Sequence, residues 1–353
     1  MEILYDVPIL GIVFQLIGYL VEVIPRLSPN ILSLATPIAL GALCGVMCER
    51  SGVVNIGIEG MMLVGAFVGW VTGAIAVQML PTGETDVFGI TVPLLIATAA
   101  AMASGMVLAL VHAWLSISIR ADQIISGTII NIAALGLTGY LSNLLDPTLR
   151  GAGRFSDFDP PDVLVDLPFV GWIFRMFLDQ GPIAMSVIVL VVVMQVLLFR
   201  SRWGLRTRAV GEHPKAADTV GIDVHRVRYR NVILGGALAG LAGGYLTLEL
   251  TGSFQDNMTL GRGFIALAAV IFGRWKPVGA LIGALLFAAS EAVGIQIGIR
   301  PPPGELGQLL AQVPNNFYRA LPYIITIVIL AGVVGRSIPP AALGRPYQKE
   351  TRS

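Results

Sequence analysis

Residues 49–67 read ERSGVVNIGIEGMMLVGAF, an apolar stretch that carries an amide at Asn55 and a carboxylate at Glu59. The apolar run continues to residue 80 and exceeds the roughly 20 residues that a membrane-spanning helix needs. A carboxylate in such a helix is costly and has to face protein or water rather than lipid. Because Asn55 and Glu59 are four residues apart, we expect them to share one face of this helix, which Gly57 and Gly60 allow to bend.

The composition of the whole chain is that of an integral membrane protein. Of its 353 residues, 55% are hydrophobic and 13% are charged, against about a quarter charged in soluble domains, and the mean hydropathy is +0.78. Lipid cannot satisfy free backbone groups, so the apolar runs must be helices. We therefore predict an all-α polytopic membrane protein, one transmembrane domain over residues 1–353 with about ten spans.

The predicted spans are residues 8–24, 29–48, 53–80, 91–117, 121–145, 182–199, 231–251, 259–275, 278–297 and 320–336. The first is short enough to lie along the interface instead. The pair at 259–297 is also compatible with a hairpin that does not fully cross. The predicted number of crossings is therefore nine to eleven.

The charged residues predict how the chain is oriented. Segment 200–230 has eight basic and three acidic residues, a net charge of +5, whereas segment 146–181 has six Asp and three Arg, a net charge of −3. Lys and Arg resist translocation, so we place 200–230 in the cytoplasm and 146–181 outside. The three lysines, Lys215, Lys276 and Lys349, then all lie on the inner side. Ten spans put both termini in the cytoplasm.

Glycines recur every four residues along several spans. They are Gly41 and Gly45; Gly65, Gly69 and Gly73; Gly236, Gly240 and Gly244; and Gly279 and Gly283. Such ridges let helix backbones approach closely in lipid, where hydrophobicity does not drive helices together. We expect these ridges to pack helices tightly within one bundle.

The sequence lacks the motifs of the common enzyme and metal-binding classes. A Walker A loop needs Gly-Lys followed by Ser or Thr, but the three lysines follow Pro, Trp and Gln. The three histidines are too scattered for a metal cluster, and Cys44 and Cys48 have no second pair with which to form a zinc site. We expect no catalytic, cofactor or metal site in this chain and no binding to nucleic acid. A transport role is favoured.

The most polar intramembrane face is predicted in the span at 121–145. Gln123, Gly127 and Asn131 share that face, with Ser126 and Thr128 beside it. An amide donates and accepts at once, which suits a polar solute, but interhelical hydrogen bonding is an equal alternative. Glu59 and Asn55 likewise either line the solute path or tie helices together. With Phe264, which either stacks on the solute or is an ordinary interfacial aromatic, the candidate path residues are Asn55, Glu59, Gln123, Ser126, Gly127, Asn131 and Phe264.

A short amphiphilic insert, GLRTRAVGEHPKAADTVGID at residues 204–223, separates two spans. Pro214 suits the first position of a helix and Gly221 the position just after its end, which predicts a helix of about two turns. This helix is either a peg that docks into a cytoplasmic partner or part of a basic loop near anionic lipid. The residues alone leave both open.

Five blocks resemble, in this order, the permease subunit of ABC importers of the branched-chain amino acid, simple sugar and nucleoside class. The blocks are ERSGVVNIGIEGMMLVGAF (49–67), RADQIISGTIINIAALGLTGYL (120–141), GLRTRAVGEHPKAADTVGIDVHRVRY (204–229), GALAGLAGGYL (236–246) and GSFQDNMTLGRGFIALAAVIFGRWKPVGALIGALLF (252–287). The branch that works with basic membrane lipoproteins and purine-type nucleosides is the most similar. The resemblance covers roughly residues 30–335 and departs in the outer loop near 146–181.

The resemblance implies a type II-like ABC importer permease of a prokaryotic cytoplasmic (inner) membrane, which is not itself an enzyme. It implies as partners a second related permease, a cytoplasmic ATPase subunit that holds ATP and Mg, and an extracytoplasmic solute-binding lipoprotein. The chain would form half of the path for a small polar solute, a purine-type nucleoside or, alternatively, a simple sugar. The implied coupling helix consists of His213, Pro214, Lys215, Ala216, Ala217, Asp218 and Thr219.

An ion-coupled secondary transporter is the alternative from another class. Glu59, Glu249 and Glu291 would then carry the proton or sodium ion. Glu249 and Glu291 lie toward the outer ends of their predicted spans, where a carboxylate reaches water cheaply. That position weakens the ion-coupled alternative.

Overall fold

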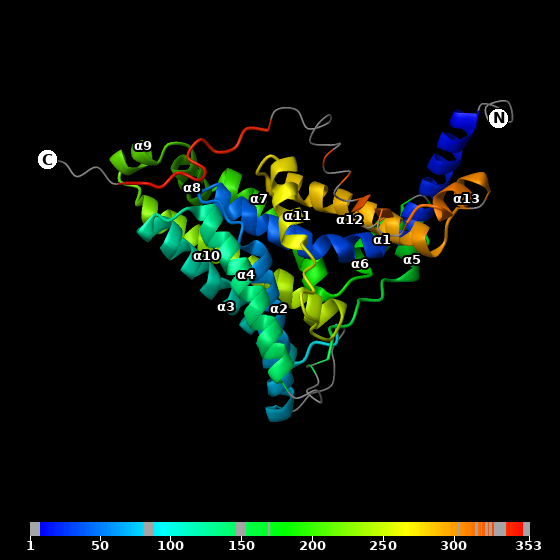
Figure 1. Ribbon diagram of the computed structural model, residues 1–353, viewed down its shortest axis with the longest axis horizontal. Helices are drawn as coiled ribbons and strands as arrows, with labels where there is room; N and C mark the ends of the chain where they lie inside the picture. Colours follow the sequence, from blue (N-terminus) through cyan, green and yellow to red (C-terminus); the bar gives the residue numbers. More distant parts are fainter. Residues whose placement is uncertain are drawn as a thin grey trace. The chain divides into compact units, whose positions relative to one another are not determined.

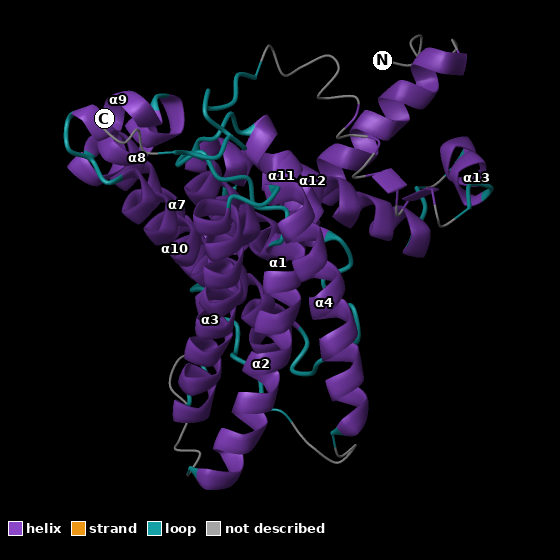
Figure 2. Ribbon diagram, turned by 60° about the vertical axis from the view of Figure 1, so that its left-hand side comes forward, coloured by secondary structure: helices purple, strands orange, loops and turns teal. Residues whose placement is uncertain are grey.

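The computed structural model describes residues 8–80, 88–145, 151, 153–168, 170–302, 304–314 and 337–348, with 317, 318, 320, 321, 324 and 327. Every regular element in these residues is a helix, as predicted (Figures 1 and 2). The helices are α1 (Pro8–Glu49), α2 (Ile58–Met79), α3 (Val92–Ala113), α4 (Gln123–Leu144), α5 (Asp162–Val165), α6 (Gly171–Leu178), α7 (Pro182–Arg200), α8 (Arg202–Glu212), α9 (Pro214–Thr219), α10 (Val224–Tyr245), α11 (Arg262–Phe272), α12 (Pro277–Ile299) and α13 (Glu305–Ala311). Two π-helical turns, η2 (Trp114–Ile119) and η3 (Leu246–Leu250), prolong α3 and α10.

Seven helices in the described residues are long and apolar enough to cross a membrane. Six of them agree with predicted spans: Ile58–Met79, Val92–Ile119, Gln123–Leu144, Pro182–Arg200, Val224–Leu250 and Pro277–Ile299. Helix α11, where a span at 259–275 was expected, has 11 residues and rises about 16 Å at 1.5 Å per residue, too little for a core of about 30 Å. Most of the predicted span 320–336 lies outside the described residues. The count of about ten is therefore not confirmed.

The two spans predicted at 8–24 and 29–48 form one continuous helix, α1, of 42 residues. Pro29 lies at the start of the second predicted span, and because proline has no N–H it leaves the carbonyl four residues earlier without its helical donor. That carbonyl, of Pro25, instead accepts a hydrogen bond of 2.8 Å from Ser28 Oγ. A side chain thus restores the lost bond, as serine often does in membrane helices, and the helix continues.

The chain divides into two compact units. Unit 1 comprises Met1–Ala35, Asp159–Gln180 and Leu285–Gly335, and unit 2 comprises Thr36–Phe158, Gly181–Ala284 and Arg336–Ser353. Within unit 1, buried Gln180 donates through Nε2 to the carbonyl of Pro29 at 2.9 Å and accepts through Oε1 from Ser33 Oγ at 2.9 Å. Gln180 therefore fixes the segment after α6 to α1. Every candidate site residue lies in unit 2.

The core of unit 2 is built from α2, α3 and α10, which pack along their glycines (Figure 2). A Cβ added to Gly65 would lie 2.6 Å from the carbonyl oxygen of Gly240, and one added to Gly105 would lie 2.2 Å from that of Gly236. The backbones approach too closely for any larger residue. The predicted close packing of these ridges is confirmed.

We expect Gly240→Ala to destabilise this core. The new Cβ would lie 2.2 Å from the backbone oxygen of Ala101, and overpacking of this kind costs about 1–3 kcal/mol or more. The melting temperature of the detergent-purified protein should fall by several degrees. Gly136→Ala on α4 is the control, since its Cβ would meet nothing within 4 Å, and equal melting temperatures for the two variants would contradict the expectation.

Candidate functional site

The site is centred on a break in the helical chain between α1 and α2. Helix α1 ends at Glu49 and α2 begins at Ile58, and the turn between them includes Gly52 at φ +88°. The prediction that Asn55 and Glu59 share a face of one helix is therefore wrong, because Asn55 precedes the helix. The backbone of this turn is held by bonds to the end of α1 and by side chains of other helices.

Val54 in this turn is held through both of its backbone polar groups. Its N–H donates to Oε1 of Gln123 at 2.7 Å, and its carbonyl oxygen lies 2.9 Å from Nε2 of His112. The other ring nitrogen of His112, Nδ1, lies 3.0 Å from Oγ of Ser126. His112 is fully buried. Gln123, Ser126 and His112 together fix Val54 from α4 and α3.

Asn131 on α4 holds the last part of the break and the first turn of α2. Its Oδ1 accepts from the N–H of Gly60 at 2.8 Å, and its Nδ2 donates to the carbonyl of Ile56 at 3.0 Å. One turn earlier on the same face, a Cβ added to Gly127 would lie 2.7 Å from the backbone nitrogen of Gly57. Helix α4 therefore lies directly against the non-helical backbone between α1 and α2.

Glu59 joins the start of α2 to the start of α11. Its carboxylate accepts from the N–H of Gly261 at 2.7 Å and from that of Gly263 at 2.6 Å. An added Cβ on Gly263 would lie 2.6 Å from Cα of Glu59, so the contact requires glycine. A negative charge is stabilised at a helix N-terminus by the free amides and the helix dipole. Glu59 therefore links α2 to α11 through these two bonds.

Glu249 makes the same kind of cap on α7. It is buried, and its carboxylate accepts from the N–H of Ile183 at 2.7 Å and from that of Ala184 at 3.0 Å. Pro182 begins this helix and has no N–H to offer. Glu249 and Glu59 therefore each accept hydrogen bonds from backbone N–H groups, a role that a bound cation could not fill.

Asn55 is surrounded by sulfur atoms rather than by other polar groups. Its Nδ2 lies 3.7 Å from Sγ of Cys44, 3.6 Å from Sγ of Cys48 and 3.6 Å from Sδ of Met61. Its side chain is fully buried, and Oδ1 has no hydrogen-bond partner among the described residues. Asn55 therefore packs against α1 and does not join Glu59.

The structure brings together part of the predicted path. Gln123, Ser126, Gly127 and Asn131 all meet the break, whereas Phe264 on α11 is 49% exposed and Thr128 bonds only to its own helix, at Ile124. His112 also holds the break, a role that was not predicted from the sequence. A histidine within an apolar run was the available signal, since a buried imidazole needs partners.

Replacing Asn131 by Leu is expected to loosen the start of α2 and to reduce solute uptake. The change leaves the buried N–H of Gly60 and carbonyl of Ile56 without partners, at about 1–3 kcal/mol for each group. Uptake per molecule in the membrane and limited proteolysis between α1 and α2 measure the two effects. Thr128→Val, on the exposed side of α4, is the control and should leave both unchanged. Uptake at the parental rate in Asn131→Leu would show that these bonds are dispensable.

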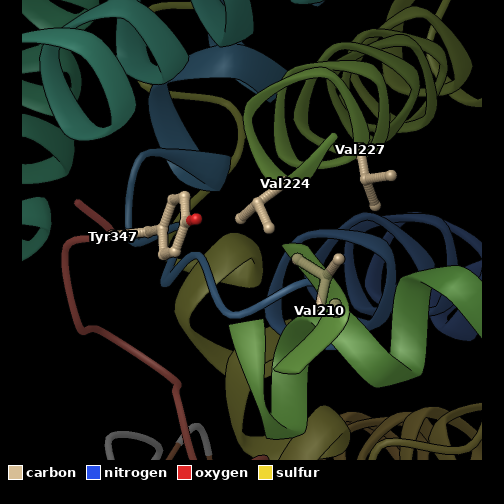
Figure 3. Close-up of a cluster of buried hydrophobic side chains, with 5 residues drawn as sticks. Val210, Val224, Val227 and Tyr347 are labelled. Carbon is tan, nitrogen blue, oxygen red and sulfur yellow. The ribbon is translucent and has the colours of Figure 1, made fainter. Parts of the chain in front are cut away.

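The insert at 204–223 contains the predicted short helix. Helix α9 runs from Pro214 to Thr219 and Gly221 follows at φ +85°, which confirms both end signals. His213, Lys215, Ala216 and Thr219 are exposed, and Pro214 and Asp218 are partly exposed. Ala217 is 4% exposed and packs into a cluster of this chain's own side chains (Figure 3). Ala217 therefore faces the interior of this chain.

Comparisons with known proteins cover nearly the whole chain. The family described as "Branched-chain amino acid transport system / permease component" matches residues 28–336. The guanosine ABC transporter permease protein NupQ of Bacillus subtilis is 39% identical over 335 residues, which cover 94% of this chain and 99% of that protein. The nucleoside ABC transporter permease protein NupC of Lactococcus lactis is 34% identical (91% and 96% covered), and the putative glucose ABC transporter permease protein TsgC13 of Haloferax volcanii is 35% identical (90% and 95% covered). No solved structure matches.

Proposed function

Since this chain belongs to the family of branched-chain amino acid transport system permease components, we propose that it is the permease subunit of an ATP-driven nucleoside importer. The observation that carries the proposal is the nearly full-length likeness to the guanosine permease protein of Bacillus subtilis. A permease of this kind provides half of a solute path and leaves ATP hydrolysis to other subunits. Two of the buried glutamates, Glu59 and Glu249, support this over an ion-coupled transporter, because both accept from backbone N–H groups at helix starts.

A purine-type nucleoside is the solute that we favour, and a simple sugar is the second candidate because of the likeness to the Haloferax volcanii protein. Uptake of labelled guanosine should be measured in cells that produce the complete transporter, with unlabelled adenosine, uridine or glucose as competitors. We expect adenosine to compete and glucose to have no effect. Competition by glucose alone would replace the nucleoside assignment by a sugar.

The polar residues at the break are proposed to shape the path rather than to bind the solute. The side chains of Gln123 and Asn131 are hydrogen-bonded to the backbone, and that of Ser126 to His112. These bonds fix where the chain leaves α1 and enters α2. Gly127 sets the distance between the turn and α4, and Glu59 sets the distance between α2 and α11. Asn55 packs the turn against α1. Phe264, exposed on α11, is the candidate for direct contact with a base.

The remaining parts of the assembly are proposals that follow from this function. They are a second related permease, a cytoplasmic ATPase subunit that binds ATP and Mg, and an extracytoplasmic solute-binding lipoprotein, in a prokaryotic inner membrane with both termini of this chain in the cytoplasm. We also propose about ten crossings, segment 200–230 inside and segment 146–181 outside. The exposed face of α9, formed by His213, Lys215, Ala216 and Thr219, supports the proposed docking of the ATPase subunit there.

A further inference from the structure

Residues 337–348, here called the C-terminal strap, lie beyond the end of the family match at residue 336. In Figure 1 the strap is drawn in red and runs beside α8 and α9. Its backbone is bonded to two different elements of unit 2: the N–H of Ala342 donates to the carbonyl of Gly211 at 2.9 Å, and that of Gly344 donates to the carbonyl of Gly52 at 3.2 Å. The strap therefore bridges the end of α8 and the turn after α1.

Tyr347 of the strap belongs to a buried cluster that includes one residue of α9. It is 6% exposed and forms one buried cluster with Val210 of α8, Ala217 of α9, and Val224 and Val227 of α10 (Figure 3). A single aromatic side chain thus packs among three helices. Aromatic rings of this size contribute a large share of the buried area in such clusters.

Helix α9 cannot hold its own position. It has 6 residues, of which Ala217 alone is buried, and helices this short are marginal without tertiary packing. An alanine side chain offers little surface to pack. Ala217 therefore depends on the cluster that Tyr347 helps to form.

Arg228 of α10 joins the strap to the break before α2. It is 1% exposed; its Nη1 donates to the carbonyl of Arg345 at 3.0 Å and its Nε to the carbonyl of Ser51 at 3.2 Å. A buried guanidinium with backbone partners on two segments fixes their separation. Ser51 lies three residues before Val54, the centre of the candidate site.

We propose that the C-terminal strap positions α9 for its ATPase partner and connects α9 to the break before α2, with Tyr347 and Arg228 as the positioning residues. The inference rests on the proposed function, because it assumes that α9 docks an ATPase subunit. It predicts that the strap affects coupling without itself forming the docking surface.

The test compares Tyr347→Ala with Tyr347→Phe, which keeps the ring, and with Gln348→Ala, an exposed neighbour on the strap. Binding of the ATPase subunit to the purified permease and guanosine-stimulated ATP hydrolysis are measured for each. We expect Tyr347→Ala to weaken ATPase binding by about tenfold or more, as removal of a buried aromatic ring does elsewhere. Tyr347→Phe and Gln348→Ala should behave like the parent. Unchanged binding and hydrolysis in Tyr347→Ala would overturn the proposal.

A label at α9 gives a second readout that needs no partner. In an Ala217→Cys background, a thiol reagent should react slowly with position 217 when Tyr347 is present and much faster in Tyr347→Ala; the native Cys44 and Cys48 are fully buried. Equal rates would count against the strap even if the Tyr347→Ala complex were too unstable to assay. If the parent itself binds no ATPase subunit, the proposed function fails and the strap proposal with it. If the parent binds the ATPase subunit and Tyr347→Ala binds it equally well, only the strap proposal is rejected.

Discussion

A protein that carries Ala216→Arg is expected to reach the membrane folded, to lose its ATPase partner and to import no solute. Ala216 is exposed on α9, so the new side chain meets solvent in the isolated permease. In the assembled transporter it would be forced against the docked subunit. Overpacking costs about 1–3 kcal/mol or more, and a buried unpaired charge adds about 3–5 kcal/mol, which together exceed a hundredfold in affinity. Co-purification of the ATPase subunit and guanosine uptake measure the effect on one preparation.

Ala217→Arg is the matched comparison, since the two positions are adjacent but Ala216 is exposed and Ala217 is buried. Its side chain would enter the cluster around Tyr347 rather than a partner, so α9 should be displaced even in the isolated permease. We expect faster proteolysis of residues 204–223 in Ala217→Arg and parental proteolysis in Ala216→Arg. Normal uptake in Ala216→Arg would show that this face of α9 has no role in coupling.

The second large effect is expected for Glu59→Gln. The carboxylate accepts from two backbone donors, at Gly261 and Gly263, but an amide offers one oxygen and turns its NH₂ group toward the other donor. Hydrogen bonds to a charged group contribute about 1.5–3 kcal/mol each, and a buried donor without a partner costs a further 1–3 kcal/mol or so. We expect a fall of several degrees in melting temperature and loss of uptake.

Asp256→Asn provides the control for Glu59→Gln. Asp256 is exposed and accepts from Oγ of Ser142 at 2.6 Å, a bond that an asparagine oxygen also accepts. This variant should retain the melting temperature and uptake of the parent. A parental melting temperature in Glu59→Gln would show that α11 does not depend on this cap.

The sequence predicted best what depends on neighbouring residues. Helix α9 was recognised from Pro214 and Gly221 because both act through local backbone geometry. The glycine ridges were recognised because close packing needs small residues at a helical spacing, as Gly65 and Gly240 show. Six spans were recognised from apolar length alone.

The misses concern contacts between distant parts of the chain. The apolar run through Val54 predicts a helix, yet its backbone is bonded to Gln123 and His112, which are 69 and 58 residues away. Such tertiary bonds leave no periodic pattern. The opposite error concerns residues 25–28, where a gap between two spans was predicted but the helix continues, with Ser28 bonded to the carbonyl of Pro25. The strap was missed because most of its bonds use its backbone, whose partners no residue type reveals.

Solute accumulation by the reconstituted transporter tests directly whether this chain is the permease of an ATP-driven nucleoside importer. The complete transporter is reconstituted in proteoliposomes with its binding protein, and accumulation of labelled guanosine is followed with or without ATP on the ATPase side and with or without ionophores that collapse ion gradients. Our account predicts accumulation that requires ATP and is unaffected by the ionophores. Accumulation that proceeds without ATP and is abolished by the ionophores would contradict it.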